Sequence, residues 1–501
     1  MNVLLISTYE LGRQPFGLAS PAAWLCQAGH AVRCLDLSRE PFDESAAGWA
    51  DLIAFYVPMH TATRLAAGLV EPVRRANPAA HICFYGLYAP VNEPWLRRLG
   101  AQTILGGEFE SALVHLADRL GNSQSGSISR EAHDASGTAV ILRAPMHPIG
   151  ARRISASEAS TSVAIRKPPE QPNAVQSEPL ISLARQQFHV PDRSLLVPLD
   201  RYAHLRLPDG RELVSGYTEA SRGCKHRCRH CPIVPVYDGV FRIVQPEIVL
   251  EDVRRQVRAG ARHVTFGDPD FFNGPRHALE IVRALHAEFP ELSYDVTIKV
   301  EHLLARASNL AVLRDTGCLF VTTAVESLDD QVLAKLEKGH TRADFLDVVA
   351  LMRRVGLAIQ PTFIPFTPWT TLDSYLDLLD TLASLDLAET IAPVQLAIRL
   401  LVPAGSRLLE LEEMRQLLDP FDPAMLTHPW RHADPRVDRL QQEIAAVVEN
   451  SRSQNVSRSE IVVRAHGAAL AAAGRAPVSS AFESPRLSRA AIPFLTEPWY
   501  C

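Results

Sequence analysis

Residues 217–232 read YTEASRGCKHRCRHCP, a short β-rich run followed by three cysteines, Cys224, Cys228 and Cys231. Three thiolates this close together can converge on one soft metal centre. Three cysteine ligands leave the fourth corner of a [4Fe–4S] cube open to an external ligand, which separates a reactive cluster from a four-cysteine electron carrier. The spacing therefore predicts a reactive iron–sulfur site directly after a strand.

The chain that follows this stretch alternates strand patterns with helix patterns. Six such units over about 190 residues predict a partial, TIM-type (β/α)6 barrel, short of the eight units of a closed one. In such a barrel the chemistry belongs to the loops that follow the strands, which is where the cysteines lie. The strand candidates are residues 217–221, 263–266, 293–298, 319–325, 358–363 and 394–401.

The first 120 residues alternate in the same way and predict a Rossmann-like, doubly wound parallel sheet with helices on both faces. Ligands of such sheets lie at the carboxyl ends of the strands, here near residues 9–17, 59–63 and 86–90. The strand candidates are residues 2–7, 31–37, 52–57, 81–85 and 103–105.

Between the two α/β regions the composition changes to Ser, Ala, Pro, Arg and Gln, as in GNSQSGSISREAHDASG. Such a segment cannot bury enough apolar surface to fold alone. We therefore expect a Rossmann-like domain at 1–120, a low-complexity linker and lead-in at 121–195, the barrel at 196–420 and a small mixed C-terminal extension at 421–501.

The composition excludes several classes of protein. The chain has 501 residues, 51 Lys+Arg against 56 Asp+Glu and a net charge of −5, which argues against a polybasic nucleic-acid binder. No stretch approaches the roughly 20 apolar residues of a membrane helix. The start, MNVLLIST, lacks a basic segment and predicts a strand, not a signal peptide. Eight cysteines are too sparse for a disulfide framework, so we expect a cytoplasmic protein.

A C-x3-C-x2-C loop on top of a β/α barrel resembles the radical S-adenosylmethionine (SAM) superfamily. The resemblance implies that Cys224, Cys228 and Cys231 hold a [4Fe–4S] cluster and that the amine and carboxylate of SAM chelate its open iron. An electron from the cluster then cleaves SAM to an organic radical. Members usually carry an aromatic residue just before the third cysteine, where this chain has His230, which we count among the SAM-contacting candidates.

Polar residues after the second and third strands fit the same resemblance. FGDPDF occupies the place of the superfamily's Gly-Gly-Glu element, whose backbone and acid hold the SAM amine. Gly267 permits close backbone approach and Asp268 or Asp270 supplies charge, although an ordinary Gly-Asp-Pro turn is the alternative. After the third strand, Lys299 and Glu301 are candidates for contact with the SAM carboxylate or ribose; an exposed ion pair is the alternative.

The sequence AVES at 324–327, with KGHT at 338–341, resembles the G-x-E-S…K-G-H-T element of B12-type radical SAM proteins. In those proteins the glutamate commonly meets the SAM ribose or amine, and the serine meets the carboxylate. The resemblance therefore assigns Glu326 and Ser327 to cofactor binding, with Ala where Gly is common as the departure.

The N-terminal region carries PFGLAS at 15–20 and AGHAV at 28–32, which resemble the cobalamin-binding domain that precedes many radical SAM barrels. The Asp-x-His-x-x-Gly signature that donates an axial histidine is absent from residues 8–17. Many relatives lack it too, so the resemblance leaves cobalamin as an optional cofactor. A degenerate scaffold that positions the substrate is the alternative.

The tail PFLTEPWYC at 493–501, together with TEASRGC, FGDPDFFNG, PFTPWTT and PVQLAIRLLVP, is similar to the CUAEP/CCAEP-tail radical SAM family. In that family the tail continues with Cys or selenocysteine and then Ala-Glu-Pro. We hypothesise a selenoprotein tail ended here at a UGA codon; a frayed terminus is the alternative. A vicinal pair at Cys501 would suit arsenic, another soft ligand or disulfide cycling, which makes Cys501 a catalytic candidate.

These observations predict a radical SAM enzyme that abstracts hydrogen from, or methylates, a small-molecule substrate with electrons from a flavodoxin or ferredoxin. They give no nucleic-acid or membrane partner and no oligomeric state. Aminocarboxypropyl or methyl transfer to arsenic in natural-product biosynthesis is the alternative reaction. A zinc-stapled binding module or an iron–sulfur electron carrier is the alternative class; zinc needs four ligands, for which His226 or His230 is available, but no second cysteine pair follows.

Overall fold

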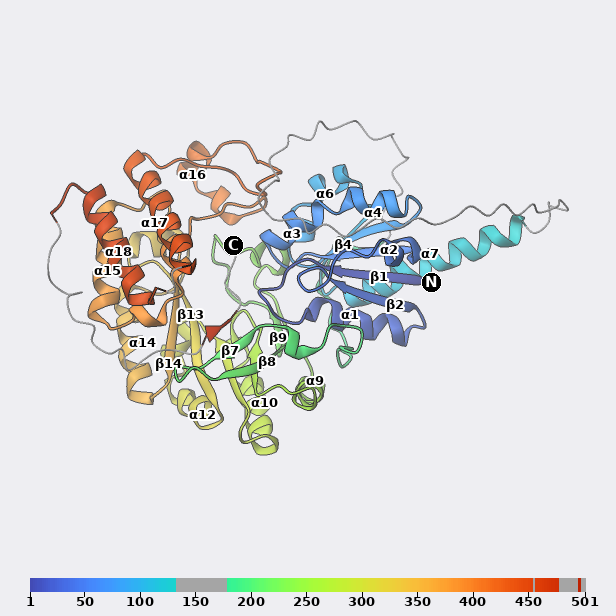
Figure 1. Ribbon diagram of the computed structural model, residues 1–501, viewed down its shortest axis with the longest axis horizontal. Helices are drawn as coiled ribbons and strands as arrows, with labels where there is room; N and C mark the ends of the chain where they lie inside the picture. The colour runs from blue at the N-terminus through green and yellow to red at the C-terminus, as the bar shows by residue number, and fades with distance from the viewer. Residues whose placement is uncertain (132–177, 454–455, 477–493, 497–501) are drawn as a thin grey trace.

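The computed structural model describes residues 1–131, 178–453, 456–476 and 494–496, which form two α/β regions side by side (Figure 1). The N-terminal region is a parallel sheet in the order β2-β1-β3-β4-β5-β6. Its strands are β1 (Asn2–Ser7), β2 (Ala31–Asp36), β3 (Leu52–Tyr56), β4 (His81–Tyr85), β5 (Thr103–Gly107) and β6 (Ile181–Ser182). The short β6 follows the linker in sequence, so the chain returns to this sheet before it enters the second region.

Helices cover both faces of this sheet because its central strands are apolar throughout. All five residues of β3 (LIAFY) are buried, as expected for a strand covered on both sides. One core lies under α2 (Glu44–Trp49), α3 (His60–Ala67), α4 (Val70–Ala76), α5 (Tyr88–Val91) and α6 (Glu93–Leu99). The other core lies under α1 (Phe16–Gln27) and α7 (Glu110–Glu131).

The second region is a curled sheet in the order β14-β13-β12-β11-β8-β7-β15, in which β8 and β11 to β14 are parallel. β7 and β15 continue one edge in antiparallel fashion. The strands are β7 (His204–Arg206), β8 (Glu212–Thr218), β11 (His263–Phe266), β12 (Ser293–Thr297), β13 (Cys318–Glu326), β14 (Ala358–Phe363) and β15 (Phe494–Leu495). Together with the N-terminal sheet, this half-barrel confirms the predicted fold class.

Helices surround the outer face of the half-barrel (Figure 1). Each long one begins at a sequence signal; α14, for example, starts with a capping box in which Thr341 and Asp344 bond each other's backbone. The helices are α8 (Val234–Tyr237), α9 (Pro246–Arg258), α10 (Pro275–Glu288), α11 (Val300–Ala305), α12 (Leu310–Asp315), α13 (Asp330–Lys335), α14 (Arg342–Val355), α15 (Leu372–Ser384), α16 (Glu412–Leu417), α17 (Pro435–Ser453) and α18 (Arg458–Ala472).

Two of the expected strands differ from the structure by more than two residues at an end. The first ends at Thr218 and starts earlier than predicted, and the chain then enters a hairpin of β9 (Ser221–Gly223) and β10 (Phe241–Ile243). The sixth, expected at 394–401, is instead a 3-10 helix over Pro393–Leu396 and one parallel bridge from Arg399 to Phe366. The side chain of Gln395 accepts the backbone N–H of Phe363 at 3.0 Å, so it replaces a sixth strand along this part of β14.

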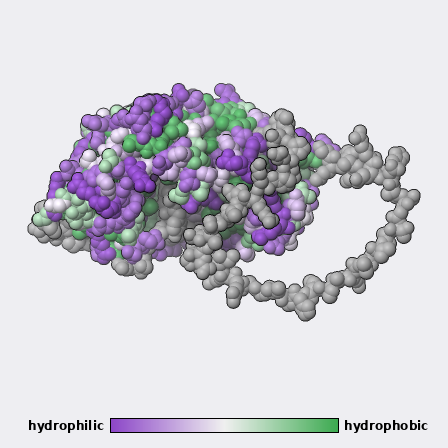
Figure 2. Space-filling view, turned by 90° about the horizontal axis from the view of Figure 1, so that it is seen from above, coloured by the Kyte–Doolittle hydropathy of each residue, from purple (hydrophilic) through white to green (hydrophobic). Residues whose placement is uncertain are grey.

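The start of the predicted linker is helical. α7 continues past residue 121 to Glu131, and residues 132–177 of the expected linker lie outside the described residues. Seen from above, the surface is largely hydrophilic with smaller hydrophobic areas (Figure 2). None of the described helices is long and apolar enough to cross a membrane.

Candidate active site

The three predicted cysteine ligands lie in the loop between β9 and α8. Gly223, with φ +72°, leads into this loop, and a Cβ there would come 2.4 Å from the ring of Tyr237. Only glycine fits this turn. Cys224 and Cys228 are buried and Cys231 is half-buried, and the backbone N–H of Cys231 donates to the carbonyl of Cys228 at 3.2 Å. The backbone therefore turns tightly between the second and third cysteines.

The environment of these thiols suits a cationic centre. Burial raises the pKa of the Cys224 thiol, and burial together with the nearby Cys228 and Cys224 raises that of Cys231 to about 12. Each thiol therefore disfavours the ionised form of its neighbour, an effect that a bound metal reverses by displacing the protons. Among the described residues the other cysteines belong to α1, β2, β4 and β13, so the donor set is three thiols. That set fits a [4Fe–4S] cluster with one open corner.

Glu326 lies next to the cysteine loop in a strained position at the end of β13. Its φ is +68°, and the register between β13 and β14 shifts between Ala324 and Glu326. Its Oε1 atom lies 3.2 Å from Nε2 of His230 and 3.2 Å from Nζ of Lys338. Burial alone would raise the pKa of Glu326, but Lys338 and the His230 contact hold it at about 2. The carboxylate is therefore charged at neutral pH and fixed from two sides.

Lys299 and Glu301 form the ion pair that the sequence left as an alternative. Nζ of the buried Lys299 lies 3.0 Å from Oε2 of Glu301, which is 37% exposed at its side chain. Glu301 also lies against Gly339, where a Cβ would come 2.8 Å from Oε2. The KGHT sequence therefore meets the first turn of α11, which follows β12.

The two acids of FGDPDF have different surroundings. Asp268 accepts the backbone N–H of Ala220 at 2.9 Å and the hydroxyl of Ser221 at 2.5 Å, and burial raises its pKa to about 7. Its contacts tie the end of β11 to the start of the cysteine loop, which is a positioning role. The Cβ position of Gly267 lies 1.8 Å from the hydroxyl of Tyr217, so only glycine fits there.

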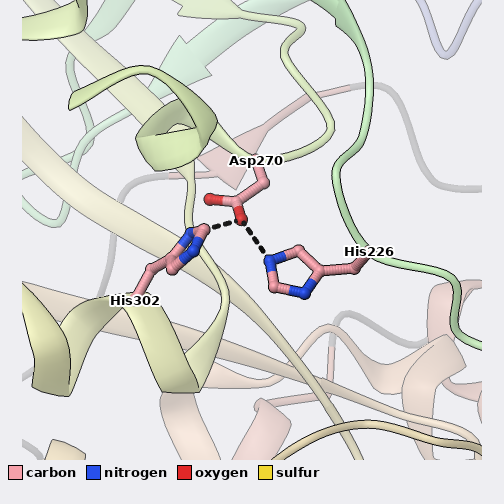
Figure 3. Close-up of side chains that lie close together, drawn as sticks. All are labelled: His226, Asp270 and His302. Carbon is pink, nitrogen blue, oxygen red and sulfur yellow. Dashed lines mark ion pairs between the residues drawn. The ribbon is translucent and has the colours of Figure 1, made fainter. Parts of the chain in front are cut away.

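Asp270 instead faces two histidines (Figure 3). Its Oδ2 atom lies 2.7 Å from Nδ1 of His302 and 3.7 Å from Nε2 of His226. His302 lies in α11, the helix that follows β12. His226 lies between the first two cysteines. His302 is not among the predicted site residues, although its place soon after a strand end indicates a position at the barrel mouth.

Two further candidates, Ser327 and Cys501, do not belong to the group formed by Asp270 and the two histidines. The hydroxyl of Ser327 accepts the backbone N–H of Asp329 at 3.0 Å, and Ser327 lines a cavity of about 230 Å³ beside α15. Cys501 lies outside the described residues.

A buried arginine joins the cysteine loop to the N-terminal sheet. Arg222 on β9 contacts Glu219 at 2.7 Å and reaches across to Glu108 at 3.3 Å and Glu110 at 2.7 Å, both of which follow β5. Burying a charge is costly unless it is paired, and this one has three partners. The domain interface therefore positions the residue two places before Cys224.

A cavity of about 250 Å³ lies between the carboxyl ends of the N-terminal strands and the mouth of the half-barrel. The N-terminal sheet contributes apolar and aromatic side chains, including Phe16, Tyr56, Leu87 and Phe109, and the barrel contributes Tyr217 and Gly267. Ligands of parallel sheets bind at this edge, so the cavity occupies the expected place for a second ligand.

Comparison with known proteins identifies the second region. Residues 218–382 match the family model of the radical SAM superfamily. Residues 218–382 form a radical SAM domain. This domain implies a [4Fe–4S] cluster and SAM, and the predicted superfamily is confirmed.

Curated relatives of this radical SAM domain cover part of the chain. A tRNA-2-methylthio-N(6)-dimethylallyladenosine synthase of Desulfosudis oleivorans is 26% identical over 40% of this chain and 44% of its own length. The hopanoid C-3 methylase of Methylococcus capsulatus is 24% identical over 30% of this chain and 29% of its own. The chain thus spans less than half the length of these two relatives.

Two solved structures share the arrangement of the N-terminal sheet and the radical SAM domain. The cobalamin-dependent SAM radical enzyme OxsB, with aqua-cobalamin bound, superposes with a TM-score of 0.65 at 14% identity, over 90% of this chain and 67% of that one. The radical SAM methyltransferase TsrM of Kitasatospora setae gives a TM-score of 0.55 at 18% identity, over 82% and 76%. At these identities the likeness shows the fold.

Proposed function

We propose that this protein is an enzyme that reductively cleaves SAM, using a [4Fe–4S] cluster held by Cys224, Cys228 and Cys231. The observation that supports this proposal is the position of all three cysteines in one loop of a radical SAM domain. When bound, the cluster would supply the electron that breaks a carbon–sulfur bond of SAM, because its fourth corner is open to that ligand. A zinc module or an electron carrier needs a fourth protein ligand instead.

The surrounding residues would bind and orient SAM. Lys299 is a buried cation whose ammonium group has three N–H donors, so it can bind a carboxylate of SAM while it keeps its contact with Glu301. The fixed charge of Glu326 suits the hydroxyl groups of a ribose or an ammonium group. Gly267 removes a side chain where the backbone faces the cavity between the domains. The N-terminal sheet packed over this mouth would exclude water from a radical.

We propose cobalamin as a second cofactor of the cavity between the domains, supported by the likeness to OxsB and TsrM, which bind it. Part of the lining suits a flat macrocycle, because Leu11, Tyr56, Leu87 and Phe109 are apolar or aromatic. The charged side chains of Glu10, Arg13, Glu219 and Arg222 line the same cavity. The cavity of about 250 Å³ is smaller than common ligand pockets of roughly 300–1,000 Å³, so binding requires these side chains to move. Methyl transfer is then the reaction favoured; without cobalamin it is hydrogen abstraction.

The substrate class in this proposal is a small molecule, and the electron donor is a flavodoxin or ferredoxin. Aminocarboxypropyl or methyl transfer to arsenic depends on Cys501, which lies outside the described residues. The identity of the SAM fragment separates aminocarboxypropyl transfer, which leaves methylthioadenosine, from the other reactions.

The test is anaerobic reconstitution of the full chain, addition of dithionite and SAM, and mass spectrometry of the SAM fragments. We expect 5′-deoxyadenosine, lost in Cys224→Ala and retained in Cys26→Ala, which changes an exposed cysteine on α1. Methylthioadenosine would instead support aminocarboxypropyl transfer. An intact cluster with neither fragment, or cleavage that survives Cys224→Ala, would contradict the proposal.

Aquacobalamin binding is measured separately, by the change in its visible spectrum on titration with the chain. We expect saturation at one equivalent, weakened by Leu87→Arg, which places a charge in the cavity. Absence of saturation would leave SAM cleavage standing and remove cobalamin from the proposal.

A further inference from the structure

A second cluster of metal-ligating side chains lies beside the cysteine loop and contains no sulfur. His226 comes from the loop itself, Asp270 from the segment after β11 and His302 from α11. One donor atom of each lies within 4.8 Å of the other two (Figure 3). Three separate strand-end segments therefore converge on one point.

The three converging atoms are buried and lack well-formed hydrogen bonds. These atoms are Nε2 of His226, Oδ2 of Asp270 and Nδ1 of His302. Buried polar atoms in folded proteins are nearly always hydrogen-bonded, so three buried polar atoms without a hydrogen bond at one point require an explanation. Two ligands that each lie 2.0–2.1 Å from a metal are roughly 3 Å apart. The 2.7 Å contact of His302 with Asp270, which has no hydrogen-bond geometry, is close to that spacing.

The atoms behind these donors are arranged as the outer shell of a metal site. Nε2 of His226 faces Asp270, and its other nitrogen, Nδ1, lies 3.8 Å from Oε2 of Glu301. Glu301 is in turn held by Lys299 at 3.0 Å. Histidines that bind metals almost always direct their second nitrogen at a carboxylate, carbonyl or water. The second oxygen of Asp270 accepts the backbone N–H of Phe272 at 3.2 Å, which fixes the carboxylate.

We propose that His226, Asp270 and His302 bind one divalent transition-metal ion, separate from the iron–sulfur cluster. Two imidazoles and one carboxylate suit zinc, iron(II) or cobalt(II) more than magnesium or calcium, which take oxygen ligands. Three protein ligands leave coordination positions open, as in catalytic sites. Because the site adjoins the cysteine loop, an open position can take an oxygen or nitrogen atom of a substrate. The ion would use Asp270, one of the two carboxylates that the sequence offered for the SAM amine.

The test uses cobalt(II) as the probe and the full chain with Cys224, Cys228 and Cys231 changed to serine, so that no cluster thiol competes. We expect one cobalt(II) per chain, with visible d–d bands and no sulfur charge-transfer band. Asp270→Asn, which keeps the oxygen that caps Phe272, and His302→Ala should each weaken binding at least tenfold. Glu301→Gln should weaken it about 10–100-fold through His226. His286→Ala on α10 is the matched control and should bind as before.

Because the triple substitution can disturb folding, the unaltered chain gives a second measurement. After cluster assembly and exposure to zinc, we expect one zinc per chain in addition to the cluster iron. His302→Ala should lose the zinc and keep the visible absorbance of the cluster. Folded variants that bind no cobalt, or a His302→Ala variant that binds metal like the unaltered chain, would overturn the proposal. Neither measurement contains SAM, so failure here is distinct from failure of SAM cleavage.

Discussion

Nε2 of His230 lies 3.2 Å from Oε1 of Glu326, and this contact joins the cysteine loop to the end of β13. The same oxygen meets Lys338, which is 3% exposed. Residues that are distant in sequence thus form one charged group beside Cys231. The position before the third cysteine, which usually carries an aromatic side chain in the superfamily, here carries a group that binds a carboxylate. The charge of Glu326 therefore helps to hold the cysteine loop in place through His230.

Glu326→Gln should weaken SAM binding about 10–100-fold. The substitution keeps the size of the side chain and removes the charge, and hydrogen bonds to charged groups contribute about 1.5–3 kcal/mol. It also leaves Lys338 buried without its carboxylate. Isothermal titration of the reconstituted chain with SAM measures the affinity, and Glu443→Gln on the exposed side of α17 is the control. Unchanged affinity would show that Glu326 acts only within the fold.

His340 should make the fold sensitive to acid. Burial, with Lys338 and Lys299 nearby, lowers its pKa from 6.5 to about 4. A depressed histidine contributes stability above its unfolded pKa and loses it as the pH falls through the folded pKa. That difference corresponds to about 3 kcal/mol of unfolding free energy, lost between pH 6.5 and 4. Urea unfolding at a series of pH values should show this slope, and His340→Gln should flatten it; an equal slope in both chains would refute the assignment.

The sequence predicted much of the fold because burial leaves a periodic signal. β1, β4, β11 and β14 have the bounds that the apolar runs indicate. The prediction of a sixth barrel strand at 394–401 was wrong, because this apolar run forms a 3-10 helix and a single bridge. The side chain of Gln395 accepts a backbone hydrogen bond from β14. A pattern of buried residues reports burial and not the hydrogen bonds that satisfy the backbone.

The cysteines of the candidate site were predictable from the sequence, whereas the cluster of His226, Asp270 and His302 was not. The cysteines are close in sequence, so their place in one loop follows from spacing alone. His226, Asp270 and His302 come from three loops, and their meeting depends on strand register and on the side chains that orient each loop. The different environments of Asp268 and Asp270 likewise depend on which backbone groups lie opposite, and two acids of equal charge give no sign of this.

Arg222→Met should destabilise the protein by about 3–5 kcal/mol, because it leaves the buried carboxylates Glu108, Glu110 and Glu219 without their shared cation. Urea unfolding measures the change. Arg254→Met breaks an ion pair with Glu288 on partly exposed side chains and should cost at most about 1 kcal/mol. Adding Glu110→Gln to Arg222→Met should restore part of the loss. Equal effects of the two arginine substitutions would mean that the interface does not depend on this charge.

Gly267→Ala should destabilise the half-barrel and reduce cluster loading. The added methyl group would come 1.8 Å from the hydroxyl of Tyr217, and overpacking of this kind costs about 1–3 kcal/mol. Tyr217→Ala in the same chain removes the ring and should recover most of the cluster absorbance. Gly467→Ala is the matched control, because it lies within α18 with no atom inside 4 Å of its Cβ position and should stabilise by about 0.5–1 kcal/mol. Thermal unfolding and iron content measure both effects. Full loading in Gly267→Ala would show that the loop after β11 can shift without disturbing the cysteine loop, and the tie through Asp268 would then be too weak to position it.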